Sequence, residues 1–202
     1  GLSTSAFELK RLLMWKQTSD WLRKISNTWI ALSGLAIFLL FSALVLPGQS
    51  ARAETYAESV GSPDMSFLYS RDDLYATAEA YGEEGRKAYV RSRFTFDVIW
   101  PLVYALFLST AISWVYGRVF ALHSRWQLAN LSPPLGAFLD YLENVSTSIV
   151  MLRYPAQTAV IDALAPVFTS VKWVFVGGSF ALLLTGAVVG IWRWIRRSKQ
   201  QR

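Results

Sequence analysis

The sequence has no cysteine and a single histidine, His123, among its 202 residues. The missing cysteines exclude disulfide bonds and thiolate metal sites, and one histidine excludes a metal site built from several. His123 could act alone as the ligand of a haem or a chlorophyll, or it is an ordinary surface side chain, the more frequent role of such a residue. The residue pattern therefore predicts no metal site and leaves any cofactor unknown.

Charged residues are also scarce, at 17%, whereas hydrophobic residues make up 53% of the chain. Apolar segments stand out at about 29–46, 94–116, 132–153 and 171–195. Each is close to the roughly 20 residues that a helix needs to cross a bilayer. We therefore expect an all-α fold: a polytopic membrane protein with four transmembrane helices and a short helical extramembrane cap.

Basic residues gather on one side of the expected spans. The two ends of the chain and the 118–132 loop together hold twelve basic and two acidic residues, whereas the loop 47–93 holds six basic and eight acidic ones. The positive-inside rule then places both termini on the cytoplasmic side of the membrane. The basic charge predicts contact with anionic lipids and not with nucleic acid, because no base-reading motif accompanies it.

The chain is expected to divide into a cytoplasmic segment 1–28, a four-helix membrane domain 29–195 with its outer loop 47–93, and a basic tail 196–202. The first segment reads as an amphipathic helix lying on the membrane surface, or as a plain basic anchor for the first span. Its apolar positions at roughly helical spacing are Phe7, Met14, Trp21, Leu22 and Ile25.

The first span ends at Pro47-Gly48 and is followed by Ala51-Arg52-Ala53, an A-x-A pattern of the signal-peptidase type. The region before the apolar run is long for a signal peptide, so an uncleaved first span is expected.

The outer loop is predicted to form a short helical cap. Ser70 and Asp73 have the spacing of a capping box, which favours a helix start at this point. Gly82 would end that helix, and a second one from about Glu84 would run without interruption into the second span. The apolar stripe of the first cap helix would be Leu74, Ala78 and Tyr81.

The third segment carries polar residues where a span should be apolar. Asp140, Glu143 and Asn144 stand at i, i+3 and i+4, so they share one helix face. Charged groups are costly in hydrocarbon, and this face must point into the protein or into a water-filled cavity.

The second span contributes Asp97 and Tyr104, again on one face. Placing the spans at common depth predicts that Tyr104 lies level with Glu143, and that Asp97 pairs with Arg153 at the outer end. The resulting polar cluster either holds the helices together by hydrogen bonds or forms a small pocket that exchanges protons or holds a cation. A third possibility is assembly into a larger complex.

The last span is expected to begin at about residue 171, because 156–170 is too polar and too broken to cross a membrane. Lys172-Trp173 would then anchor it at the outer interface. Small residues that allow close helix packing are Gly178, Gly186 and Gly190.

A longer pattern resembles small, uncharacterised four-helix bacterial membrane proteins, and it covers roughly residues 70–175. The resemblance implies this architecture, and with it a location in the bacterial inner membrane, but no activity. Its elements are Tyr81-Gly82-x-x-Gly85-Arg86-x-x-Tyr89, Phe96-Asp97-x-x-Trp100-Pro101-x-x-Tyr104, Asp140-x-x-Glu143-Asn144, Arg153-Tyr154-Pro155 and Lys172-Trp173.

The function that we expect is an integral membrane scaffold or accessory subunit of a larger membrane complex, with lipids and other membrane subunits as partners. The alternative is a membrane-embedded binding protein or enzyme for a hydrophobic small molecule that uses the carboxylate cluster. A nucleophilic triad is disfavoured, because His123 lies at the opposite membrane face from the acids.

Overall fold

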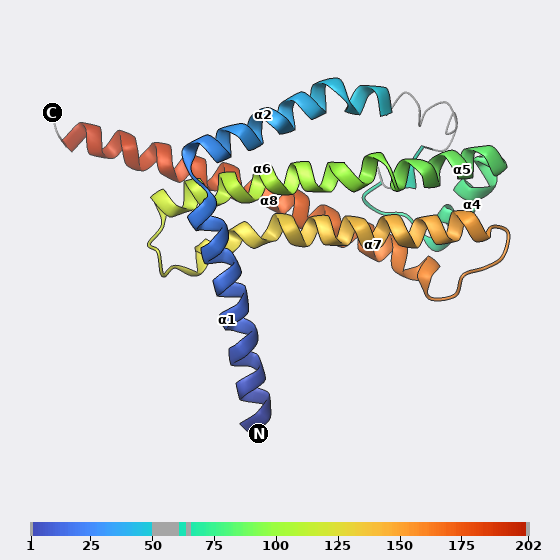
Figure 1. Cartoon of the computed structure of the whole chain (residues 1–202), viewed down its shortest axis with the longest axis horizontal. Helices are drawn as coiled ribbons and strands as arrows, with labels where there is room; N and C mark the ends of the chain where they lie inside the picture. The colour runs from blue at the N-terminus through green and yellow to red at the C-terminus, as the bar shows by residue number, and fades with distance from the viewer. Residues whose placement is uncertain (1, 50–60, 64–65, 201–202) are drawn as a thin grey trace.

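The computed structural model describes residues 2–49, 61–63 and 66–200, and side chains from residue 10 onward. This described part is helical and contains no strand (Figure 1). The A-x-A pattern at Ala51 lies outside it. The helices are α1 (Leu2–Ile25), α2 (Thr28–Leu44), α4 (Arg71–Ala80), α5 (Gly82–Arg93), α6 (Phe96–Val119), the 3₁₀ helix η2 (Arg125–Leu131), α7 (Ser132–Arg153) and α8 (Ile161–Gln200).

Among the residues that the structure describes, three helical stretches are long and apolar enough to cross a membrane: Thr28–Gln49, Gly82–Val119 and Ile161–Gln200. They contain three of the four predicted spans. The fourth prediction, 132–153, matches the bounds of α7, but α7 is not among these stretches because its polar side chains lower its hydropathy.

The long helices run alongside one another, and α7 packs most extensively against α8 and also against α6 (Figure 1). α2 packs mainly on α6, where Gly34 brings the two backbones close: a Cβ at this position would lie 3.2 Å from the Cα of Phe107. Phe38 of α2 stacks on Trp100 and Phe107 at the same interface.

Two predicted boundaries were wrong. α8 begins at Ile161 and runs for 40 residues through Pro166, so the segment expected to be broken is part of one continuous helix. Pro166 has no N–H to donate to the preceding turn of the helix. The helix is stabilised at this point by packing, because the neighbouring side chains of Asp162, Ala165 and Thr169 are buried. The helix from Gly82 also does not continue without interruption, because Phe94 and Thr95 separate α5 from α6.

The helices α4 and α5, which were predicted to form the outer cap, agree with their sequence signals. Asp73 N–H donates to the Ser70 hydroxyl at 3.1 Å, and Ser70 N–H donates to the Asp73 carboxylate at 2.8 Å, which completes the capping box. The predicted stripe is buried, with Leu74 and Ala78 fully covered. Gly82 joins α4 to α5 with a φ of +62°, a left-handed conformation that glycine adopts without strain.

The N-terminal helix α1 projects crosswise from one end of the bundle (Figure 1). Its attachment is polar: the Ser19 hydroxyl donates to the Gln127 carbonyl at 2.9 Å, and the Asn130 amide donates to the Ser19 carbonyl at 3.0 Å. Leu12 and Trp21 of α1 are exposed.

The glycines of α8 differ in their surroundings. A Cβ at Gly186 would lie 2.5 Å from the Tyr116 ring, and one at Gly190 would lie 3.2 Å from Val119, so α8 approaches α6 closely at these positions. A Cβ at Gly178 would have no neighbour within 4 Å. The expected close packing therefore involves Gly186 and Gly190 but not Gly178.

Candidate functional site

A polar cluster occupies the centre of the bundle, where α6, α7 and α8 meet. All of its side chains are buried, and Glu143 is fully inaccessible. Its members are Tyr104 from α6, Asp140, Glu143 and Asn144 from α7, and Lys172 from α8.

Lys172 is the centre of this cluster. Its Nζ lies 2.5 Å from Oε2 of Glu143 and 3.7 Å from Oδ1 of Asp140. The Tyr104 hydroxyl donates to the other oxygen of Asp140 at 3.0 Å, and the Asn144 amide lies 3.5 Å from Oδ1 of the same carboxylate. Asp140 therefore links all three helices through a single side chain.

The cluster brings the two carboxylates of Asp140 and Glu143 close to the ammonium of Lys172. Removing such groups from water is costly, and only close pairing and hydrogen bonds offset the penalty. The arrangement can therefore hold helices together electrostatically, or exchange a proton at a buried carboxylate.

Two predicted members lie elsewhere. Asp97 pairs with Arg93, Oδ2 to Nη1 at 2.8 Å, and Arg153 is exposed at the end of α7. The predicted pair between Asp97 and Arg153 was wrong, because Arg93 stands one helical turn before Asp97 and already satisfies it. Tyr104 does join the cluster, but one turn from the expected level, on Asp140 instead of Glu143.

Lys172 was missed, because the sequence placed it at the outer end of a helix beginning at about 171. The actual start at Ile161 puts Lys172 three turns inside α8. A signal was present: the buried positions of α8 recur at spacings of three, four or seven residues. They are Asp162, Ala165, Thr169, Lys172, Ser179 and Gly186.

A second buried carboxylate joins the outer cap to the bundle. Asp162 is fully inaccessible, and its Oδ2 accepts a hydrogen bond from the Tyr75 hydroxyl at 3.0 Å. The same hydroxyl accepts from Thr158 N–H at 2.8 Å, and Nε of Arg71 lies 3.7 Å from Asp162. This group fixes α4 against the start of α8, and it was not predicted from the sequence.

One cavity of the described part has no residue of the central cluster in its lining. It has a volume of about 960 Å³ and lies between the end of α2 and the start of α6, beside α5. Arg93 is one of its lining residues. The members of the central cluster are buried, whereas Arg93, the partner of Asp97, adjoins this cavity.

His123 is exposed in the turn between α6 and η2. Within the described ranges, no group of three or more histidine or acidic residues is placed to hold a metal ion.

Searches of known protein families, curated proteins and solved structures found no match to this chain. The resemblance to small four-helix membrane proteins therefore stays a prediction.

Proposed function

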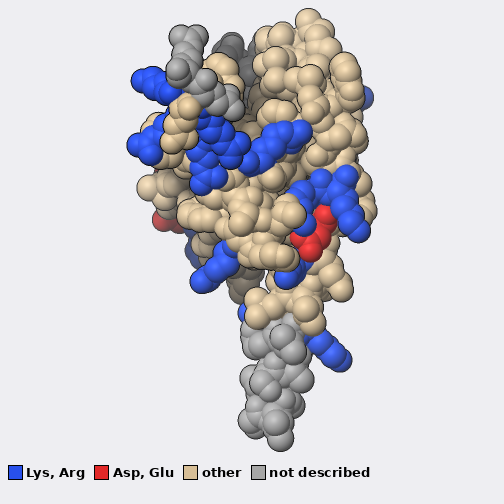
Figure 2. Space-filling model, turned by 90° about the vertical axis from the view of Figure 1, so that its left-hand side faces the viewer, with Lys and Arg blue, Asp and Glu red and all other residues tan. Residues whose placement is uncertain are grey.

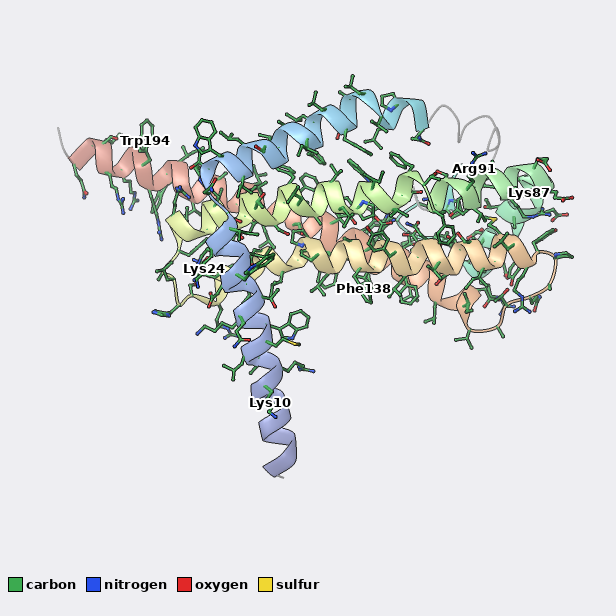
Figure 3. The ribbon with its side chains drawn as sticks, viewed as in Figure 1. Lys10, Lys24, Lys87, Arg91, Phe138 and Trp194 are labelled. Carbon is green, nitrogen blue, oxygen red and sulfur yellow. The ribbon has the colours of Figure 1, made fainter. Side chains whose placement is uncertain are left out.

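We propose that the chain is an integral protein of the bacterial inner membrane with four spans, α2, α6, α7 and α8, and both termini in the cytoplasm. The observation that supports α7 as the fourth span is its two-sided surface. Its acids face α8 and α6, while Phe138, Val145 and Leu152 form an exposed apolar stripe at seven-residue spacing. Figure 3 shows Phe138 on the outer edge of the bundle.

The length of α7 suits this role. Its 22 residues extend about 33 Å at 1.5 Å per residue, close to the roughly 30 Å of a hydrocarbon core. Its charged side chains would be inside the bundle, as intramembrane charges require.

The cytoplasmic side is assigned from charge. At the end of the bundle where α1 joins, basic side chains far outnumber acidic ones (Figure 2). They include Arg118, Arg125 and Arg193, which would meet an anionic leaflet. α1 would then lie along the membrane surface, because it runs crosswise to the spans.

Within the membrane, we propose that the protein serves as a scaffold or accessory subunit of a larger complex. The supporting observation is that α2 packs mainly on α6 and leaves the rest of its apolar circumference open. Leu39, Leu40 and Leu44 are 55%, 59% and 75% exposed on this open face. A span that contacts one neighbour retains a surface for a helix of another protein.

Photo-crosslinking in the native membrane tests this role. A photoreactive residue at Leu40, on the open face of α2, is expected to yield one reproducible protein adduct. The matched position Leu184, 66% exposed on α8, is expected to yield lipid adducts only. Lipid adducts alone at both positions would reject the subunit role.

The topology has its own test, because the natural chain has no cysteine. A cysteine introduced at position 66 should react with an impermeant thiol reagent from outside, and one at position 124 should not. Reaction of both positions from one side would reject four spans.

A second candidate function is binding or conversion of a hydrophobic small molecule at the central cluster. The observation that favours it is a buried group of two carboxylates, an ammonium and a phenol in one place, since such groups can exchange protons with a ligand or bind its polar end.

A further inference from the structure

The cavity of about 960 Å³ beside α5 has walls of two kinds. Phe41 from α2 and Phe96 and Ile99 from α6 form an apolar wall within the predicted spans. Lys87 and Arg91 come from α5, which belongs to the polar outer cap. The groove therefore changes from apolar to cationic along the direction in which a bilayer changes from hydrocarbon to headgroup.

Among the described residues that line the groove, cations outnumber acids. Lys87, Arg91 and Arg93 line it, with Glu84 as the acidic lining residue. Lys87 bridges Glu83 at 2.8 Å and Glu84 at 3.1 Å, but all three side chains are more than half exposed, and such pairs are weak and easily exchanged. Arg91 is exposed, and Figure 3 shows it on the side of α5 toward the end of α2.

Arg93 has a different role, because it is buried and paired with Asp97 at 2.8 Å. Its guanidinium also lies 4.3 Å from the centre of the Tyr89 ring. The Arg93–Asp97 pair is therefore a fixed part of the wall. Of the two arginines among the described lining residues, Arg91 is the exposed one.

We infer that this groove binds a phospholipid with an anionic headgroup, its phosphate against Arg91 and Lys87 and an acyl chain along Phe41, Phe96 and Ile99. A guanidinium suits a phosphate because its planar donors form two parallel hydrogen bonds to the oxygens. The inference depends on the proposed membrane insertion and is independent of the scaffold role.

Fluorescence quenching in vesicles tests the site with the full chain. A bimane label is attached to Ser92→Cys, which lines the groove, or to Leu184→Cys on the exposed face of α8 as the matched control. The vesicles contain phosphatidylcholine and phosphatidylglycerol, with either lipid brominated. Brominated phosphatidylglycerol is expected to quench the label at 92 more strongly than brominated phosphatidylcholine, and both should quench equally at 184.

Charge variants then identify the contact. Arg91→Gln is expected to weaken the preference for phosphatidylglycerol at position 92 about fivefold, the loss for one basic group near a membrane surface. Arg125→Gln, at the opposite end of the bundle, should leave it unchanged.

Three results would overturn the site and leave the proposed membrane insertion standing. Equal quenching by both lipids at 92 would mean ordinary exposure to lipid, and quenching at 184 without quenching at 92 would mean that lipid does not enter the groove. A preference that survives Arg91→Gln would remove the proposed phosphate contact. Absence of quenching at both positions would reject membrane insertion as well.

Discussion

Glu143 of α7 and Lys172 of α8 form a buried ion pair, with 2.5 Å between Oε2 and Nζ. Neither side chain is more than 7% exposed, so neither charge can return to water when its partner is lost. The pair joins the two helices that pack most extensively against each other. It is the feature of the central cluster whose removal should be most damaging.

Lys172→Met should lower the free energy of unfolding by about 3–5 kcal/mol, because it leaves Glu143 and Asp140 buried without their cation. The double variant Glu143→Leu/Lys172→Met should lose less than the sum of the single changes, since it leaves one carboxylate instead of two. Denaturation in detergent measures all three. Lys199→Met in the exposed tail is the control, and additive losses would show that the two side chains do not interact.

The role of charge at Glu143 can be separated from its role in packing. For a structural cluster, Glu143→Gln retains the shape and a hydrogen-bond acceptor for Lys172, so Tm should be nearly the same in both proteins between about pH 5 and 8. For a cluster that binds protons or cations, Tm of the natural protein should change within this range, and the Gln variant should be flat. We expect Tm to be independent of pH in this range for both proteins. A Tm that changes with pH in the natural protein but not in the Gln variant would favour the binding function.

Gly186→Ala should destabilise the bundle by about 1–3 kcal/mol, because the added Cβ would overlap the Tyr116 ring. That ring cannot move aside, since Tyr116 is 1% exposed and its hydroxyl donates to the Leu182 carbonyl at 2.8 Å. Gly178→Ala is the matched control and should be neutral or slightly stabilising. Equal Tm changes for the two variants would contradict the close approach at Gly186.

At the outer end of α6, Asp97→Asn should cost about 1–3 kcal/mol, because it removes the partner of the buried Arg93. Arg153→Leu should change the free energy of unfolding by less than about 0.5 kcal/mol, because Arg153 is exposed at the end of α7. Thermal unfolding in detergent distinguishes these values. A large loss for Arg153→Leu would restore the pairing with Asp97 that the sequence suggested.

The capping box of α4 predicts a dependence on pH. Hydrogen bonds from the backbone and hydroxyl of Ser70 hold the pKa of Asp73 below its ordinary value of 3.8. A lowered pKa in the folded state stabilises the protein above the unfolded value, and the contribution is lost as the pH falls through the folded value. The difference in Tm between the natural protein and Asp73→Asn should therefore shrink from about pH 5 to about pH 3. A constant difference would mean that the charge of Asp73 does not contribute.

Local signals in the sequence predicted much of the fold. The capping box at Ser70 and the prolines after Ser132 mark helix starts through backbone chemistry that depends on a few neighbouring residues. The shared face of Asp140 and Glu143 follows from helix geometry alone. These features do not depend on which helices become neighbours, so they could be predicted.

The partners of the charged residues could not be predicted in this way. Placing the expected spans at common depth correctly predicted that Tyr104 lies in the cluster. It also predicted a pair of Asp97 and Arg153, because the nearer partner Arg93, four residues before Asp97, was not considered. Lys172 was assigned to the membrane surface, where lysine is usual. The start of α8 at Ile161 shows that this lysine lies on the helix face that points into the bundle. That start was not predicted, because Pro166 was expected to break the helix.

The unbroken course of α8 has a mechanical consequence. Its 40 residues measure about 60 Å, roughly twice the thickness of a hydrocarbon core. One end is fastened to α4 through Asp162 and Tyr75, and the other carries the basic residues Arg196 and Arg197. A tilt of α4 would therefore be transmitted along α8 to its far end, because no break in the helix lies between the two.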